Sequence, residues 1–254
     1  MNRNYKYGHK RDVVDIRDRK FKVASPISLP PVIDLRSSPF MPEVWDQGKL
    51  GSCVAHSTGC IFNFEQRKQG SPDFIPSRLM IYYNARLLEE NVNNDDGCQI
   101  RDAIKALIKQ GVCDETEWAY DESKFAIKPS DNCYIHAEKH QVIQYMSVPQ
   151  TLIGIKTALV QGYPISFGIQ IYESFESEQV INSGIVPMPD VEREQCLGGH
   201  AIVIVGYDDN KKIFICRNSW GNKVMMGGYF TLPYGYVLVN VLASDFWIIQ
   251  KNED

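Results

Sequence analysis

The most informative stretch of this chain is Asp46-Gln47-Gly48-Lys49-Leu50-Gly51-Ser52-Cys53-Val54-Ala55. Gly51 and Ser52 read as a tight turn before Cys53, and the small and apolar residues that follow predict an amphipathic helix. A cysteine at the N-terminus of a helix lies where the backbone dipole favours an anion and lowers the pKa of a thiol. The stretch therefore predicts a reactive cysteine at the start of a helix.

Two later stretches supply the partners that a thiol nucleophile needs. Gly199-His200-Ala201 carries a histidine, and Arg217-Asn218-Ser219-Trp220-Gly221 carries an asparagine. Their distance in sequence is no obstacle, because only the fold has to bring them to Cys53. His200 would take the thiol proton, while Asn218 would accept from the other ring nitrogen and fix the tautomer. Trp220 would shield the Asn218–His200 bond from water.

The remaining part of such a site is a donor for the negative charge that develops on the substrate. Gln47 precedes Cys53 by six positions, and its side-chain amide could donate to an oxyanion together with the backbone N–H of Cys53. A structural thiol, a metal ligand or a redox centre would not explain why all three neighbourhoods carry glycine. His56 is a poorer base than His200, because helical geometry turns it elsewhere and no asparagine orients it.

At these residues the chain resembles the papain/cathepsin family of cysteine proteases. Gln47 to Cys53 is similar to the family's Gln-Gly-x-Cys-Gly-Ser-Cys block, and His200 to Tyr207 to its His-Ala-Val…Val-Gly-Tyr block. Asn218 to Gly221, followed by Gly228-Tyr229-Phe230, is similar to its Asn-Ser-Trp-Gly…Gly-Tyr block. The resemblance implies an α+β, papain-like two-lobe fold, with a helical N-terminal lobe and a β-barrel-like C-terminal lobe. The active site is expected in the cleft between the lobes.

The resemblance also implies the chemistry. Peptide bonds would be hydrolysed through a thioester acyl-enzyme, with Cys53 as nucleophile, His200 as acid and base, and Asn218 as orienter. Gln47 would stand at the oxyanion hole. An endopeptidase without a cofactor is expected, since no insertion suggests a loop that blocks the cleft. The alternative is a catalytically silent papain-fold binding module, but such modules usually lose the nucleophile or the base.

Substrate contacts are implied by the resemblance too. Gly97 and Cys98 belong to a shortened version of the family's Gly-Gly cleft wall. The pocket for the second substrate residue before the scissile bond would be lined by Ile100, Gly168, Ala201 and Ser244. This largely apolar lining predicts a preference for Leu, Val or Phe. Asp245, adjacent to Ser244, could tilt the pocket toward a basic residue.

Two departures from the family concern the compartment. Leu50 replaces a cysteine that forms a disulfide in secreted relatives, and Gly8 to Lys22 is charged where a secretory signal would be apolar. Cys60 and Cys216 are expected to be buried free thiols. The sequence therefore predicts a reducing, intracellular (cytoplasmic) location.

Residues 1–29 are predicted to be an N-terminal extension, and residues 30–254 a peptidase domain. Pro31-Val32-Ile33-Asp34-Leu35-Arg36 is similar to the start of mature chains in the family. The extension could therefore be a short pro-segment that lies extended across Cys53 until it is cut near Leu29. An extended residue spans roughly 3.3 Å, so the segment is long enough to cross a cleft. The alternative is a tail without a regulatory role.

Within the domain, a helical lobe is predicted over about 31–125 and a sheet lobe over about 126–254. Helices are expected after Cys53, over 100–108 with a stop at Gly111, and around 151–161. Strands are expected over 164–171, 200–207, 212–217 and 228–232.

Composition limits the partners. A net charge of −4 gives no basic field for nucleic acid. No apolar run approaches the roughly 18–20 residues that span a bilayer. Protein or peptide substrates and a monomer are expected. Cys133, His136 and His140 have zinc-like spacing but lack a fourth ligand, and the oxygen-rich segment 93–97 lacks the rest of a calcium loop. No metal site is predicted.

Overall fold

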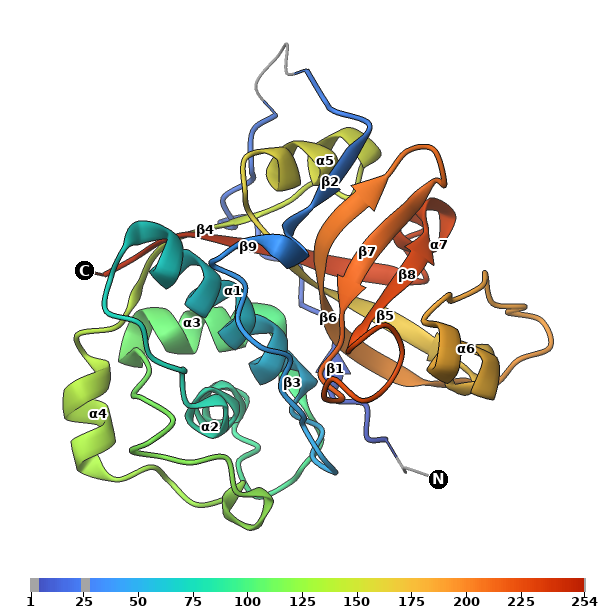
Figure 1. The fold of residues 1–254 in the computed structure, drawn as a ribbon. Helices are drawn as coiled ribbons and strands as arrows, with labels where there is room; N and C mark the ends of the chain where they lie inside the picture. The colour runs from blue at the N-terminus through green and yellow to red at the C-terminus, as the bar shows by residue number, and fades with distance from the viewer. Residues whose placement is uncertain (1–4, 24–27, 254) are drawn as a thin grey trace.

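The computed structural model describes residues 5–23 and 28–253 and has two lobes (Figure 1). Helices gather on one side, and most strands lie on the other. The helices are α1 (Cys53–Gln69), α2 (Arg78–Leu88), α3 (Ile100–Gln110) and α4 (Asp131–Ala137). The predicted α+β class and the two-lobe arrangement are confirmed.

Helix α1 is the central element of the molecule. It begins at Cys53, as predicted, and ends at Gly70, whose φ of 76° is the left-handed conformation that glycine adopts readily. Every residue from Cys53 to Gln66 is buried, so the helix is not amphipathic. The reason is that α1 contacts α2 and α3 as well as strands of the sheet. A helix enclosed by neighbours on all sides needs no polar face.

The sheet has six strands along one antiparallel path, and a seventh strand joins at its side. The order is β4 (Val142–Ser147), β9 (Ala243–Asn252), β5 (Ile165–Tyr172), β6 (Cys196–Asp208), β7 (Ile213–Arg217) and β8 (Tyr229–Pro233), with β2 (Val32–Asp34) paired to β6. Within residues 5–23 and 28–253, no pairing joins β4 to β8. The expected β-barrel-like lobe is therefore an open sheet.

Short helices cover the sheet away from α1. They are α5 (Leu152–Val160), α6 (Glu178–Ser183) and α7 (Tyr234–Leu238). Three 3-10 turns are η1 (Leu35–Ser37), η3 (Glu173–Glu176) and, in the helical lobe, η2 (Glu122–Lys124). One core packs under these helices, and another lies between the sheet and helices α1 and α3. In the part of the chain that the structure describes, no helix combines the length and apolarity of a membrane span.

The boundary between the lobes differs from the predicted one. Helix α4 lies beyond residue 125, yet its Cys133 and Ala137 pack with Met80 of α2 and with Cys113. The helical lobe therefore extends to about residue 137. Strands β4 and β9 were not predicted, and they reach across to contact α3 and α1 (Figure 1).

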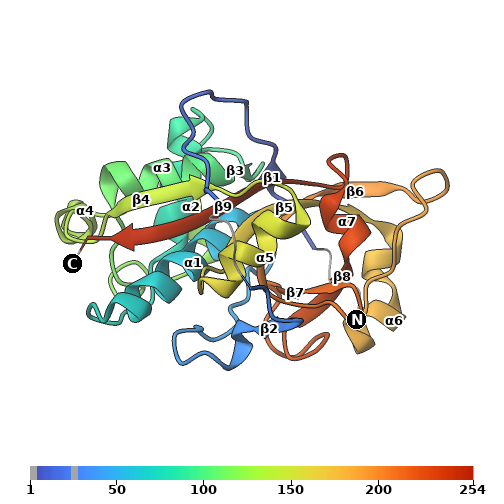
Figure 2. The same cartoon turned by 90° about the horizontal axis from the view of Figure 1, so that it is seen from above.

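The N-terminal segment, residues 5–23, lies against the body of the molecule and is called the arm below. Its strand β1 (His9–Lys10) pairs in parallel with β3 (Cys98–Gln99), where the two lobes meet. Beyond β1 the arm loops outward and returns to β4 (Figure 2). There Phe21 donates its N–H to the Ser147 carbonyl at 2.8 Å, and its ring is buried in the sheet-lobe core.

Candidate active site

Cys53 lies at the first position of α1 and is fully buried. The backbone N–H of Ala201, on β6, donates to its Sγ at 3.4 Å. Burial raises the pKa of the Cys53 thiol, while N–H groups of Ala201, Gly8 and Val54 that point at the sulfur lower it. The sulfur therefore lies where the helix N-terminus and β6 meet, and an arm residue covers it.

His200 and Asn218 are brought together by neighbouring strands. His200 Nε2 lies 2.8 Å from Asn218 Oδ1, and the same oxygen accepts from Ser219 N–H at 2.8 Å. Because Asn218 Oδ1 can only accept, the His200 proton is on Nε2, which leaves Nδ1 as a base. Burial lowers the pKa of His200 to about 4, although the Asn218 bond raises it. The imidazole is therefore neutral near pH 7.

Trp220 lies against the catalytic histidine, as the sequence predicts. Its indole stacks on the His200 ring with centroids 5.4 Å apart and an angle of 28° between planes. It is almost fully buried, so it excludes water from that side of the imidazole.

Gln47 presents its amide to the arm. Its Nε2 donates to the carbonyl oxygens of Lys6 at 3.1 Å and Leu50 at 2.8 Å. Its Oε1 accepts from the Ser219 hydroxyl at 2.6 Å, which fixes the amide orientation. The donor predicted for an oxyanion thus already binds a peptide carbonyl, and that carbonyl belongs to the arm.

Arm aromatics cover the imidazole and the indole. The Tyr7 ring lies edge-on to His200 with centroids 5.6 Å apart, and the Tyr5 ring stacks on Trp220 at 3.6 Å. Between the lobes, the backbone of the arm approaches the body closely. Cys98 N–H donates to the Gly8 carbonyl at 2.8 Å, and a Cβ on Gly8 would stand 1.7 Å from the Gly51 carbonyl oxygen. Only glycine fits at position 8.

The substrate residues expected from the sequence lie around the arm. Gly97 and Cys98 form a wall beside Gly8. Gly168 and Ser244 are direct partners across β5 and β9. Ile100 and Ala201 belong to the same buried cluster as Cys53 and Val203. Gly97, Cys98 and Gly168 therefore lie against the arm. Ala201 contacts Cys53, and Ile100 is buried at the start of α3.

Two acidic residues of the site were missed or underestimated. Asp245 accepts from His9 Nε2 at 3.0 Å. Asp95 forms an ion pair with Lys6 at 2.7 Å and accepts from the Gly51 N–H at 3.0 Å. Asp95 belongs to the oxygen-rich turn before the cleft wall. The run of Asn and Asp residues in this turn was the sequence feature that could have indicated a polar contact here. Its function in the fold is to hold the turn before Cys53.

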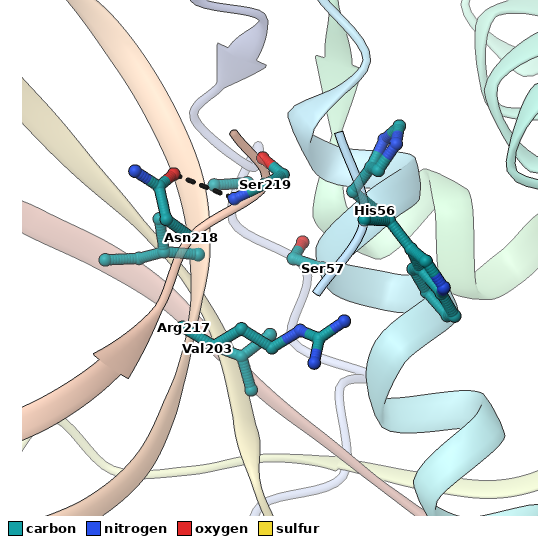
Figure 3. Close-up of a pocket in the computed structure, with 9 residues that line it drawn as sticks. His56, Ser57, Val203, Arg217, Asn218 and Ser219 are labelled. Atoms are coloured by element: carbon teal, nitrogen blue, oxygen red, sulfur yellow. Dashed lines mark hydrogen bonds between the residues drawn. The ribbon is translucent and has the colours of Figure 1, made fainter. Parts of the chain in front are cut away.

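His56 has a structural position. Its Nδ1 lies 3.0 Å from the Ser52 carbonyl oxygen, and its ring packs edge-on against Tyr120. Burial, followed by the nearby Arg78 charge, lowers its pKa well below the usual range. Figure 3 shows His56 and Ser57 on the α1 side, and Asn218 and Ser219 on the β-sheet side, of a small pocket that these residues line. His56 is therefore a neutral core residue.

The residues with zinc-like spacing do not converge. Cys133 contacts Ser130, His136 pairs with Glu117, and the His140 ring packs on Phe74. Among residues 5–23 and 28–253, no three His, Cys, Asp or Glu side chains are grouped to hold a metal ion. All seven cysteines lie in these ranges, and each is a free thiol.

A thiol at a helix N-terminus, with an imidazole fixed by an amide between two lobes, defines the class of thiol proteases. The sequence model of the papain family cysteine proteases matches residues 29–244. The chain belongs to the papain family of cysteine proteases.

Two similar proteins match almost the whole of this chain, and a third matches a smaller part of it. An uncharacterised peptidase C1-like protein of Acanthamoeba polyphaga mimivirus is 42% identical, over 100% of this chain and 89% of its own. The crystal structure of xylellain, a cysteine protease of Xylella fastidiosa, has a TM-score of 0.91 and 40% identity, over 96% of this chain and 95% of its own. Procathepsin L of Felis catus is 26% identical, over 81% of this chain and 61% of its own.

Proposed function

We propose that this papain-family protease is an endopeptidase in which Cys53 attacks the substrate carbonyl. The observation that carries the mechanism is the His200 Nε2–Asn218 Oδ1 bond of 2.8 Å. It puts the ring proton on Nε2, so Nδ1 is free to take the thiol proton. The thiolate then forms a bond to the carbonyl carbon, and His200 returns the proton to the leaving amine. Water, activated by His200, hydrolyses the thioester.

Gln47 is the proposed side-chain donor of the oxyanion hole. In this structure its amide already donates to a peptide carbonyl, that of Lys6, at 3.1 Å. The Ser219 hydroxyl holds the amide in that orientation. A donor fixed before the reaction begins costs no reorganisation when charge develops on the carbonyl oxygen. The backbone N–H of Cys53 is the proposed second donor.

The preference for an apolar second residue before the scissile bond stays a prediction. Ile100 and Ala201 support it, because both lie in an apolar buried cluster beside Cys53. Asp245 follows Ser244 and carries a carboxylate at the same part of the cleft, which favours a basic residue instead.

We also propose that the arm is a pro-segment, which makes the chain a zymogen. Supporting this, the arm covers Cys53 and His200 so completely that both are 0% exposed. It further occupies the Gln47 amide through Lys6 and the cleft wall through Gly8. A covered site is also unfavourable for charge, because burial disfavours both thiolate and imidazolium. The predicted cut near Leu29 would free the segment.

A thiol-reactive peptidyl probe tests the catalytic part of this proposal. Full-length protein, with its arm cut after folding, should be labelled at Cys53 and should hydrolyse peptides. A Cys53→Ala protein treated identically is the matched control. Absence of both labelling and hydrolysis after the arm has been removed would favour the silent binding module.

Gly8→Val provides an arm-displaced chain without truncation. The new side chain would meet the Gly51 carbonyl, so the arm cannot occupy the cleft. Ile16→Ala is the matched control, because Ile16 is an exposed arm residue. Faster Cys53 labelling in Gly8→Val, with Ile16→Ala like the parent, is expected. Equal labelling of all three proteins would dismiss the pro-segment.

A further inference from the structure

The arm is fixed to the body of the protein in two separate places. Its cleft half, residues 5–12, covers Cys53 and His200. Its core half, residues 18–23, lies against helix α3 and strand β4, beyond the cleft. A loop, residues 13–17, joins the two halves and stands out from the body in Figure 2. Because different residues make the two attachments, a cut in this loop would separate them.

The core half is part of the sheet lobe. Phe21 is only 5% exposed and belongs to the same buried cluster as Val148 and Ile155. The backbone is fixed as well, since Ser147 donates its N–H to the Arg19 carbonyl and accepts the N–H of Phe21, each at 2.8 Å. Removal of a buried phenylalanine leaves a cavity and costs stability. The core half is therefore expected to stay with the catalytic domain when the cleft opens.

The loop between the halves has little support from the body. Val13, Val14 and Ile16 are 67%, 93% and 98% exposed, which makes them the three most exposed large apolar side chains in the described part of the chain. The loop and the start of β9 line a cavity of about 630 Å³, so the loop is not packed on the sheet there. Exposed loops of this kind are preferred sites of proteolytic cleavage.

The hydrogen bonds that shape the loop are local. The Asp15 carboxylate accepts from the backbone N–H of Arg17 at 3.0 Å and from its guanidinium at 2.7 Å. Asp18 donates its N–H to the Asp15 carbonyl at 3.2 Å. Asp15 also pairs with Lys105 of α3 at 3.8 Å, but an ion pair of this length at the surface contributes little. The loop can therefore open into an extended form, as a protease requires, without disturbing either half.

We propose that an endopeptidase cuts the arm at a peptide bond between residues 13 and 18, after which the cleft half leaves and the core half stays. The proposal rests on the proposed pro-segment function. Water adds across the bond, so the released fragment gains a carboxylate and the retained chain gains an amine. The protease acts from another molecule, because Gly8 covers Cys53 as long as the arm is docked. A cut near Leu29, which removes both halves, is the competing outcome.

Cutting the loop turns the cleft half into a separate peptide. While it is tethered, the chain fixes its effective concentration beside the cleft. After the cut, contacts such as the bond from Cys98 N–H to the Gly8 carbonyl and the Lys10–Glu89 ion pair at 2.9 Å have to compete with dilution. The cleft then opens without the loss of any residue from the sheet-lobe core.

The first test identifies the bond that is cut. Full-length Cys53→Ala protein, which cannot cut itself, is incubated with a trace of Gly8→Val protein, and in a second reaction with a trace of trypsin. Intact mass and N-terminal sequencing should place the first new N-terminus at residues 14–18, with the core half retained. A loop cut by Gly8→Val makes a second copy of this chain the source of the protease, and a loop cut by trypsin alone points to another endopeptidase.

Two results of this test would overturn the proposal. One is a first cut elsewhere in residues 5–31 by the Gly8→Val protein. The other is a loop that neither protease cuts. Peptide hydrolysis by Gly8→Val is measured beside them. Its absence contradicts the proposed function, while the trypsin reaction still tests the loop.

The second test separates the two halves without a cut. Phe21→Ala should lower the melting temperature by about 6–20 °C, because it leaves a cavity in the core. Cys53 should nevertheless be alkylated as slowly as in the parent, with exposed Cys196 as the reference thiol. Phe21→Leu, which leaves a smaller cavity, keeps the comparison if Phe21→Ala does not fold. Alkylation of a folded Phe21 variant as fast as that of Gly8→Val would show that the arm is one unit and would overturn the proposal.

The third test measures release of the cleft half. Protein that keeps Cys53 is cut in the loop, and the alkylation rate of Cys53 is followed as the protein is diluted about a thousandfold. The rate should rise at least about tenfold, because the fragment is now a separate molecule whose binding depends on concentration. The uncut parent is the control and should show no dependence on dilution. Cut protein that is alkylated as slowly as the uncut parent at every dilution would overturn the proposal.

Discussion

The Tyr7 ring lies edge-on to the His200 imidazole, with ring centroids 5.6 Å apart. Tyr7 is an arm residue, and its hydroxyl bonds to Glu176 of η3 in the sheet lobe. The arm is therefore fixed on both sides of the catalytic histidine, since Gly8 pairs with Cys98 of the helical lobe. A substrate can reach the imidazole only after this ring has moved.

Substitution of the three catalytic residues should give a graded loss of activity in arm-displaced protein. Cys53→Ala and His200→Ala each remove a group that forms or breaks a bond, so kcat should fall by about 10⁴-fold or more. Asn218→Ala removes only the orientation of His200, and a loss of about ten- to hundredfold is expected from one strong hydrogen bond. Steady-state peptide hydrolysis measures all three. Substantial turnover by Cys53→Ala would contradict the assignment.

Gln47→Glu should separate binding from chemistry. Glutamate keeps an oxygen for the Ser219 hydroxyl but has no N–H for the oxyanion. We expect kcat to fall by about 10²–10³-fold with a small change in KM, as for other oxyanion-hole donors. Ser219→Ala is the companion variant, because it loosens the amide without removing it. A KM change alone, with kcat intact, would assign Gln47 to ground-state binding.

Docking of the arm should respond to pH through groups of opposite sign: His200 and Asp245 on one side, and Asp12 on the other. The pKa of Asp245 is lowered in the docked state because the bond to His9 outweighs the effect of burial. Burial lowers the pKa of His200 to about 4, so docking loses favour as the pH falls from 6.5 toward 4. Burial and the neighbouring Asp245 raise the pKa of Asp12, so docking gains favour as the pH falls below that raised value. The two effects oppose each other in the acidic range, and the parent should change little there.

Asp12→Asn removes the opposing group and exposes the combined effect of His200 and Asp245. Its arm should undock progressively between pH 6.5 and 4. Tryptophan fluorescence reports this, because Trp220 contacts Tyr5 and Trp247 contacts Asp12. Gly8→Val gives the undocked reference signal at each pH. Fluorescence of Asp12→Asn that keeps its docked value down to pH 4 would contradict this pH dependence of arm docking.

Buried Arg217 should be important for stability and not for chemistry. Its guanidinium donates to the carbonyls of Pro42 and Glu43 and lies over the Trp45 ring. Arg217→Met keeps the length of the side chain but leaves both carbonyls unpaired, at a cost of about 3 kcal/mol. Denaturant unfolding measures the loss, and Arg193→Met, at an exposed arginine, is the control. Equal midpoints for the two variants would contradict this assignment.

The sequence was most informative where one short segment fixes one element. Cys53 begins a helix because the turn before it and the small residues after it act locally, and Asn218 and Trp220 lie in one segment beside His200. Strands β4 and β9 were missed because their pairing joins distant residues, such as Ser147 and Trp247. The prediction that helix α1 is amphipathic is wrong, because the burial of α1 depends on neighbours from both lobes that its own sequence does not reveal.

The part of the cleft around Gly168 and Asp245, where the His9 ring lies, was the least predictable part of the site. Ser244 was placed correctly beside Gly168, but Asp245 was considered only as its neighbour in sequence. The positive φ of Asp245 and the His9 ring against Gly168 arise from packing between the arm and the sheet. No local pattern around His9 indicates that its imidazole enters the cleft, because the contact spans most of the chain.

Restraint of the protease by its arm is tested by the peptide hydrolysis rate of folded, full-length protein with and without Gly8→Val, using Ile16→Ala as the control. A protease restrained by its own arm predicts little activity in the parent and in Ile16→Ala, and an increase of at least about tenfold in Gly8→Val, as expected if the substitution abolishes a contact worth 1.4 kcal/mol or more. Cys53→Ala in the Gly8→Val background should return the rate to zero. Equal rates in the parent and Gly8→Val, or hydrolysis that survives Cys53→Ala, would contradict the account.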